Sequence, residues 1–513
     1  MIIKEEYSNM KSFQNIVSDN EQRPLRFWNK EQRPKYVRLM WQTAHVSLSS
    51  LLLAPMSKTI QISLLSIVLV LVSSCGIYGK YKPVTDVDST LYGDLVLADT
   101  THNLANLTWE QLFTDPLLQD LIRQALDSNI DLRVAHEHVN QAEATLRGAQ
   151  LAYLPSISLA PQAGFSPQYS IRQGTYDLVA SASWEIDIFG RTLNSLRGAK
   201  AAKQQALDYE QAARCGLIAG VANAYYTLLM LDAQLQTAEE NEQTWAKTIN
   251  TIRRMKEAGM ADEAAVTQME ATYYSIQTMV LDSRRQIRQT ENALCLMLAT
   301  TYRPIPRGTL DAQTVPAELE VGVPAQLLYN RPDVRAAQQN MARAFYAANL
   351  SRSNCLPSLN LSGTFGWTNH SYGTIIDPMT MISSLAAGLV APLFNSGRNI
   401  AQVKMAKSQQ QESILTFTKT VLSAGNEVND ALHTYQTAHA KCELYDKQVE
   451  ALSRAQRATQ LKMQFGSTTY LEVLTAQNSL LTAEFTRISN RMAELQAVVS
   501  LYHALGGGNT YVL

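Results

Sequence analysis

The chain has 513 residues, of which 46% are hydrophobic, 8% aromatic and 17% charged, and its 44 lysines and arginines nearly balance 45 aspartates and glutamates. This balance, without a basic patch, argues against nucleic acid as a partner. Five cysteines exclude a disulfide scaffold, and 23 glycines with 16 prolines are too few for a fibrous or disordered protein.

Residues 56–74 have the features of a lipoprotein signal peptide. Lys58 supplies a short basic region, Ile60 to Val72 form an apolar stretch, and Val72-Ser73-Ser74-Cys75 provides the small residues of a cleavage site. Because this site resembles the bacterial lipobox, we predict that Cys75 is acylated and becomes the first mature residue. The alternative is a buried cysteine after a hydrophobic helix. Residues 1–55 are predicted to be a mis-annotated extension before a true start at Met56.

The rest of the chain contains one pattern twice. At an offset of 202, Asp131 and Arg133 correspond to Asp333 and Arg335, and after a small insertion Gly259 corresponds to Gly466. The chain therefore divides into an extended segment at 75–108, a first repeat at 109–300, a proline-rich linker at 301–326, a second repeat at 327–508 and a tail at 509–513.

Within each repeat the periodicity changes from helix to strand and back. A helix is predicted from Asp115 to about Gln150, followed by two strands near residues 157–166 and 176–187. In the second repeat the strands fall near residues 359–367 and 381–393. Proline-free stretches then predict helices over Thr192–Ala258 and Asn399–Phe465, each ending at a glycine turn and returning as a helix of about 40 residues.

Four strands with one apolar and one polar face suit the wall of a membrane barrel. Four strands cannot close a barrel, and an open edge in lipid leaves backbone groups unpaired. Several chains are therefore expected to pool their strands, eight from two chains or twelve from three. The alternative is a soluble sandwich, or a hairpin pair packed on the helices.

Six segments of the chain resemble a known family. They are Trp109–Ile122, Asn129–Ala135 and Trp184–Arg191 in the first repeat, and Val323–Ala337, Ala391–Arg398 and Leu501–Gly508 in the second. In this order they resemble the outer-membrane efflux factors of the TolC type, in their NodT-like lipoprotein branch. The resemblance covers about residues 75–508.

The resemblance implies an α+β membrane protein, mainly α. A homotrimer would form a twelve-stranded β-barrel in the outer membrane, continued by a long α-helical barrel in the periplasm, where most of the chain would lie. It implies a passive conduit for drugs or other toxic solutes, partnered by a periplasmic adaptor and an inner-membrane pump, often of the resistance-nodulation-division class. No catalysis is implied, and no cofactor beyond the lipid on Cys75.

In this family the tips of the two helical hairpins close the tunnel and meet the adaptor. By resemblance, Gly259 and Gly466 mark the tips, with Asp262 and Glu263 beside the first tip. Glu472 occupies a position that is acidic in relatives, and Thr475 a position where a second carboxylate is common. Ala265 replaces another acidic residue. The implied aperture ring is therefore thinner, and three converging Glu472 carboxylates would attract cations.

Other chemistry has little support. His136-Glu137-His138 resembles a metal-binding triplet, but residues i and i+2 of a helix point to different faces, so no metal site is predicted. Two alternative functions remain, the outer-membrane channel of a type I protein secretion system and a periplasmic adaptor lipoprotein. Adaptors lack this duplicated pattern of strands and helices. The cargo and the cognate pump are not specified by the sequence.

Overall fold

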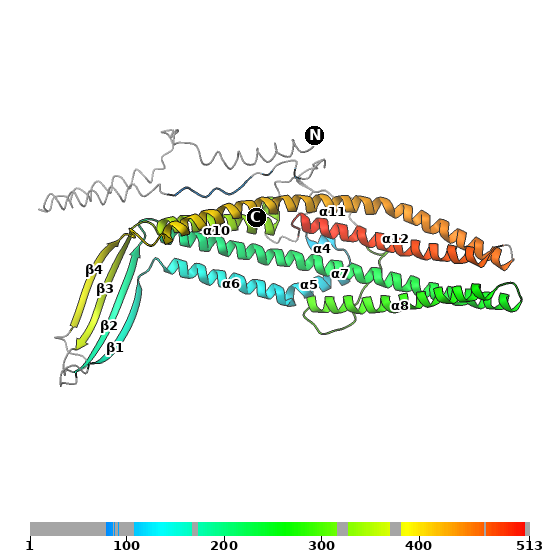
Figure 1. Cartoon of the computed structure of the whole chain (residues 1–513), viewed down its shortest axis with the longest axis horizontal. Helices are drawn as coiled ribbons and strands as arrows, with labels where there is room; N and C mark the ends of the chain where they lie inside the picture. Colours follow the sequence, from blue (N-terminus) through cyan, green and yellow to red (C-terminus); the bar gives the residue numbers. More distant parts are fainter. Residues whose placement is uncertain are drawn as a thin grey trace. The chain divides into compact units, whose positions relative to one another are not determined.

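The computed structural model describes residues 78–85, 87, 91, 107–166, 173–314, 327–369, 381–465 and 468–507, all within one compact unit, Ile77–Leu513. This unit is mainly helical, with one sheet (Figure 1). The first repeat contains α4 (Trp109–Leu112), α5 (Pro116–Ser128), α6 (Ile130–Leu151), β1 (Ser156–Ser166), β2 (Gln173–Ile186), α7 (Arg191–Glu257) and α8 (Glu263–Met297). The second contains α9 (Leu327–Asn330), α10 (Pro332–Ser353), β3 (Ser358–Asn369), β4 (Met381–Val390), α11 (Arg398–Gln464) and α12 (Tyr470–Ala504).

The two longest helices match the sequence prediction to within one residue at each end. Both α7 and α11 have 67 residues, and both return helices have 35. At 1.5 Å per residue, each long helix extends for about 100 Å. Each begins after a glycine with a left-handed backbone, Gly190 or Gly397, which bends the chain into the helix in a conformation that residues with a Cβ rarely adopt.

The predicted continuous helix from Asp115 to about Gln150 is wrong, because the chain breaks between α5 and α6 at Asn129. Its side chain accepts a hydrogen bond from the Leu132 N–H at 2.9 Å, and so caps α6. Its amide also donates to the Met297 carbonyl at the end of α8, at 2.8 Å. The Ser128-Asn129 pair was the available signal, since both residue types favour caps over helix interiors.

The four strands form one antiparallel sheet in the order β1-β2-β3-β4. The sheet joins the two repeats, because β2 of the first pairs with β3 of the second. The register places apolar residues of all four strands on the same face. One row across the sheet is Ile157, Ala182, Gly363 and Leu385, and the neighbouring row on the opposite face is Ser158, Ser181, Thr364 and Ser384.

Two apolar clusters hold the helices together. The larger centres on α5, α7 and α12 and includes Leu118, Tyr225 and Val499, all fully buried. The smaller lies toward the hairpin tips and joins α7, α8 and α12 through Trp245, Met269 and Val473. In the described part of the chain, α7 is the one helix long and apolar enough to cross a membrane, but half of that apolar stretch is buried inside the protein, as in a core helix.

The repeats also define how the helices neighbour one another. Helix α10 packs against both α11 of its own repeat and α7 of the other. Helix α6, its counterpart, packs against α7, and no described element packs to a similar extent on its other flank. Helix α10 of the second repeat therefore has a long helix on each side, whereas α6 of the first repeat has one on a single side.

Candidate functional site

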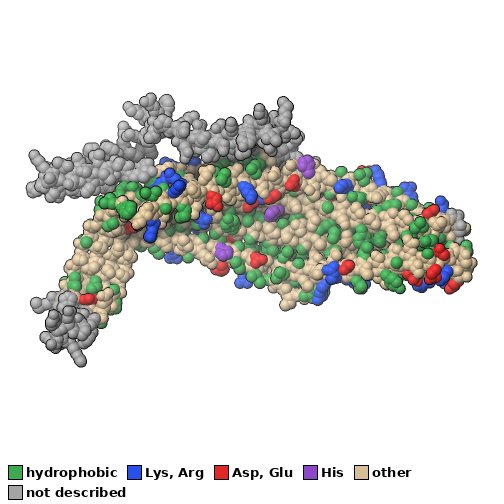
Figure 2. Space-filling model, viewed as in Figure 1, with side chains coloured by type: hydrophobic (Ala, Val, Ile, Leu, Met, Phe, Trp, Pro, Cys, Tyr) green, Lys and Arg blue, Asp and Glu red, His purple; other side chains and the backbone are tan. Residues whose placement is uncertain are grey.

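The first functional surface is the apolar face of the sheet. Ile157 and Leu159 on β1 are 77% and 65% exposed, and Leu385 and Leu389 on β4 are 79% and 66% exposed. Large aliphatic side chains on one continuous strand face are not left in water by a soluble protein. Figure 2 shows that charged side chains on the face in view lie over the helices and the far hairpin ends, and are sparse over the strands.

The opposite face of the sheet is polar. The Ser158 and Ser181 hydroxyls are 3.1 Å apart, and those of Thr364 and Ser384 are 2.5 Å apart, so hydroxyl groups pair across neighbouring strands. The Thr368 hydroxyl donates to the Asp177 carboxylate. A sheet with an apolar face toward lipid and a hydroxyl-lined face toward water has the pattern of a porin-like wall. Its outer strands, β1 and β4, each have one paired edge in this chain.

The first hairpin tip is a glycine turn closed by a capped helix. Gly259 adopts φ +71°, and the Met260 N–H returns to the Met255 carbonyl at 2.8 Å, which ends the helix in a left-handed cap. Asp262 then caps α8 by accepting from the Ala265 N–H at 2.8 Å. Glu263 forms an ion pair with Lys256 across the turn. Both predicted acidic residues of this tip therefore shape the turn.

At the second tip, Gly466 lies outside the described residues, whereas both aperture candidates are described. Glu472 is exposed in the first turn of α12 and accepts a hydrogen bond from the Thr468 hydroxyl. Thr475 is also exposed, and its hydroxyl donates to the Leu471 carbonyl at 2.8 Å. Three residues apart on a helix, these side chains share one face. Val473 and Leu474 instead face the smaller apolar cluster that joins α7, α8 and α12.

A buried charged joint in the second repeat escaped the sequence analysis. The guanidinium of Arg331, 5% exposed, contacts the Asp333 carboxylate at 2.6 Å and 3.0 Å and that of Glu427 at 2.7 Å. It also donates to the Ala504 carbonyl at the end of α12, at 2.9 Å. Arg331 thus fastens the start of α10 to α11 and α12. The signal was the Arg-Pro-Asp sequence, in which proline places the arginine at a helix start.

The joint of the first repeat is the counterpart of this one. Arg331 aligns with Asn129 at the offset of 202, and Ala504 aligns with Met297 at the later offset of 207. Each polar residue therefore donates to the last turn of the equivalent return helix. The same contact is made by a neutral amide in one repeat and by a buried, paired cation in the other.

The histidines near residue 136 and Cys75 are the remaining sequence candidates. His136 lies 2.9 Å from the Glu210 carboxylate of α7, a contact between two packed helices. Within the described ranges, no cluster of three or more histidine, cysteine, aspartate or glutamate side chains is arranged to hold a metal ion. Cys75 lies outside the described residues, so its predicted acylation stays a prediction.

Comparison with known proteins gives a consistent result. The model of the outer membrane efflux protein family matches residues 121–300 and 323–507. The chain is 27% identical over 424 residues to the cation efflux system protein CusC of Escherichia coli K12, covering 80% of this chain and 91% of CusC. It is 29% identical over 423 residues to the toluene efflux pump outer membrane protein TtgC of Pseudomonas putida, covering 78% and 85%.

Solved structures show the same fold. The open state of the MtrE outer membrane channel of Neisseria gonorrhoeae is 26% identical and superimposes with a TM-score of 0.75, over 85% of this chain and 98% of MtrE. The outer-membrane channel OprN is 23% identical and superimposes with a TM-score of 0.76, over 85% of this chain and 99% of OprN.

Proposed function

The chain belongs to the outer membrane efflux protein family, and on that premise we propose that it is the outer-membrane channel subunit of a tripartite efflux system. It is a passive conduit for toxic solutes, without catalytic activity. The observation that carries this proposal is the sheet, which has one exposed apolar face and one hydroxyl-lined face, and whose two outer edges are paired with no other described strand. Only closure with other copies satisfies such edges in lipid.

The two repeats indicate how the copies meet. In one chain, β3 pairs with β2 of the other repeat, and α10 packs on α7 of the other repeat. Among the described elements, the equivalent partners of the first repeat, β1 with β4 and α6 with α11, do not pack on each other to a similar extent. If the copies are related by rotation around a ring, β4 and α11 of a second copy can pack against β1 and α6 of the first. Three copies give a twelve-stranded barrel, continued by a helical barrel in the periplasm.

The start of the described chain supports a lipid anchor on Cys75. The Tyr78 ring lies 3.6 Å from the position of a Cβ on Gly190, at the junction between β2 and α7. This junction is where the barrel wall would leave the membrane. Three extended residues span no more than about 11 Å. An acyl group on Cys75 could therefore reach the periplasmic leaflet of the outer membrane beside the barrel. The anchor and the barrel would then hold the chain at the same depth.

The hairpin tips are the surfaces proposed to meet the other components. They lie at the opposite end of the helices from the sheet (Figure 1). A periplasmic adaptor would contact the tips, and an inner-membrane pump, of the resistance-nodulation-division class, would supply the energy. The relatives named above include an efflux system for cations and an efflux pump for toluene, so the fold does not fix the cargo.

Native mass spectrometry of the detergent-extracted mature protein tests the assembly and the anchor together. We expect three copies, each starting at an acylated Cys75. The same preparation should form ion-conducting pores in planar lipid bilayers. A monomer without pore activity would contradict the channel, whereas a conducting trimer without lipid would contradict the anchor alone.

Glu472 is proposed to line the periplasmic aperture. Glu472→Gln removes three converging charges in a trimer, so we expect a lower preference for cations over anions and weaker block by divalent cations. The reversal potential in a salt gradient across a planar bilayer measures this preference. Glu443→Gln is the matched control, because Glu443 is a solvent-exposed carboxylate paired with Lys447 on α11. Equal reversal potentials for the wild type and Glu472→Gln would exclude an aperture role.

A further inference from the structure

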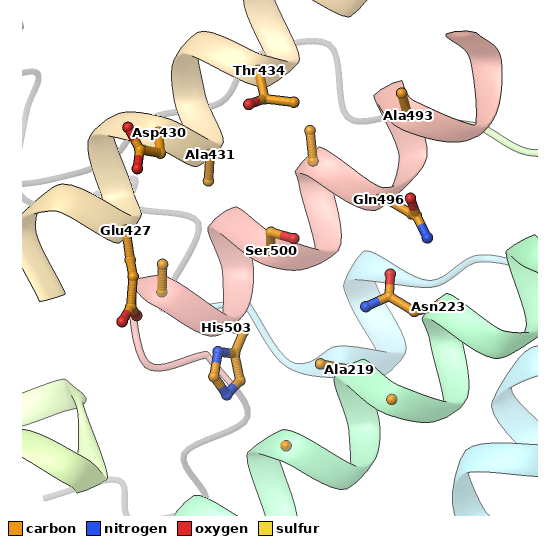
Figure 3. A pocket seen from close by; sticks show the side chains of 14 residues that line it. Ala219, Asn223, Glu427, Asp430, Ala431, Thr434, Ala493, Gln496, Ser500 and His503 are labelled. Carbon is orange, nitrogen blue, oxygen red and sulfur yellow. The ribbon is translucent and has the colours of Figure 1, made fainter. Parts of the chain in front are cut away.

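A groove of about 840 Å³ lies between α7, α11 and α12, away from both hairpin tips. Figure 3 shows Glu427, Asp430 and Thr434 of α11 on one side, Ala219 and Asn223 of α7 on the other, and Gln496, Ser500 and His503 of α12 between them. Its volume is in the range of sites that hold drug-sized molecules.

The groove exists because its floor is made of small residues. Gly216, Ala219 and Gly220 follow one another along one face of α7, and Ala493 and Ala497 do so on α12. A Cβ placed on Gly216 would meet no atom within 4 Å, which shows that the space above it is open. Backbone and methyl groups therefore form a mostly apolar surface onto which a flat ligand could pack.

The rim of the groove is acidic. Its lining contains Glu427 and Asp430 but neither lysine nor arginine. Glu427 is shared with Arg331 and remains 47% exposed at its side chain. Asp430 is exposed and forms no ion pair with any described residue. An apolar floor beside carboxylates complements a molecule that is both apolar and positively charged.

A polar group in the groove also lacks a partner. The amide oxygen of Asn223 is buried and accepts no hydrogen bond from the described residues. The Asn223 side chain lines the groove beside the small-residue floor, so it places a polar amide next to the apolar surface.

The groove lies on the opposite side of α12 from α5 and the 301–314 segment, which pack on the other side of the helices. Along α12, Gln496, Ser500 and His503 line the groove, whereas Val499 and Tyr502 face the core that also contains α5 and the 301–314 segment. In a ring of three chains, α5 and the 301–314 segment would block a central tunnel if they pointed inward. They must therefore lie on the outer surface of the ring. The groove would then open into the tunnel.

We propose that this groove is a low-affinity binding site for amphipathic aromatic cations on the tunnel wall. The placement in a tunnel rests on the proposed channel function, whereas the binding itself does not. Weak binding suits a conduit, because a solute must be able both to enter and to leave a site along its path.

Fluorescence anisotropy of ethidium, a planar aromatic cation, with the full-length mature protein in detergent tests the proposal. We expect saturable binding that weakens at high salt, as for any attraction to exposed carboxylates. Fluorescein, an aromatic anion of similar size, should not bind. Asp430→Asn should weaken ethidium binding by about threefold, the scale of one solvent-screened charge.

Gly216 offers a matched pair of variants at one position. Leucine and alanine have similar helix propensities, so both should fold at least as well as glycine. Gly216→Leu fills the groove and should weaken ethidium binding by about tenfold or more, whereas Gly216→Ala should stay within about twofold of the wild type. Equal binding by both variants, or equal binding of fluorescein, would overturn the proposal.

Two further readouts separate the explanations. If Gly216→Leu alone abolishes the trimer in native mass spectra, the groove holds another copy of the chain, and the proposal is wrong. If the wild type conducts ions in bilayers but ethidium does not bind, the cation site is refuted while the channel function stands. A chain that binds ethidium but forms no pore would refute the channel and leave the site.

Discussion

Leu385→Arg should destabilise the assembled protein by about 2–4 kcal/mol, the cost of a cationic side chain on the lipid face near the middle of a membrane barrel. Leu385 lies near the centre of β4, is 79% exposed and shares the apolar face with Ile157 and Trp184. Within the described strands, the residues that share this face carry no charge. The measurement is the fraction of chains that fold and insert into phospholipid vesicles across a urea titration.

Ser384→Arg provides the matched control. Ser384 neighbours Leu385 in the same strand but belongs to the polar face, where its hydroxyl lies 2.5 Å from that of Thr364. If this face lines a water-filled channel, its arginine stays hydrated, and we expect a loss below about 1 kcal/mol, close to one hydroxyl hydrogen bond. Equal losses in the two variants, or a larger loss for Ser384→Arg, would mean that the apolar face does not contact lipid.

The elements of this fold were predictable where local rules decide the structure. Alternation of apolar and polar residues located three strands, and a less regular pattern located the fourth, each to within a few residues, because side chains alternate between the two faces of a strand. The absence of proline and the glycine turns located α7 and α11. Alternation does not reveal which strands pair, so the β2–β3 contact between repeats required the structure.

The features that were missed depend on contacts between distant segments. The break at Asn129 combines a local cap on α6 with a bond to Met297, a residue far along the chain. The Ser128-Asn129 pair signals the cap, whereas the bond to the end of α8 is visible only in the structure. The groove arises where small residues of three helices meet, and each small residue alone reads as ordinary helix packing. Acylation of Cys75 and an aperture role for Glu472 remain predictions from sequence, tested by the experiments above.

Arg331→Ala should lower the free energy of unfolding by about 2–3 kcal/mol, the scale of lost hydrogen bonds to charged groups. The full cost of breaking a buried ion pair is not expected, because the side chains of Asp333 and Glu427 are 42% and 47% exposed and water can hydrate them. Arg331 is 5% exposed at its side chain and pairs with Asp333 and Glu427. Its removal also leaves the Ala504 carbonyl without this donor. Burial alone would raise the pKa of Asp333, but the hydrogen bonds and charge of Arg331 outweigh burial and hold that pKa below its usual value. The measurement is urea unfolding in detergent, followed by tryptophan fluorescence.

Two controls distinguish this joint from an ordinary ion pair. Arg123→Ala removes a surface pair with Asp120, whose side chains are 51% and 73% exposed, so it should cost less than about 1 kcal/mol. Arg331→Lys keeps the charge but cannot form the bidentate contact with the Asp333 carboxylate. Its loss in free energy of unfolding should therefore lie between those of Arg123→Ala and Arg331→Ala. The lowered pKa of Asp333 stabilises the wild type above about pH 4, the range where the unfolded carboxylate is ionised, and that contribution disappears as the pH falls through the folded pKa. Arg331→Ala should therefore lose the acid-sensitive part of its stability contributed by Asp333. A loss no larger than that of Arg123→Ala, with an unchanged pH profile, would show that the joint does not hold the second repeat together.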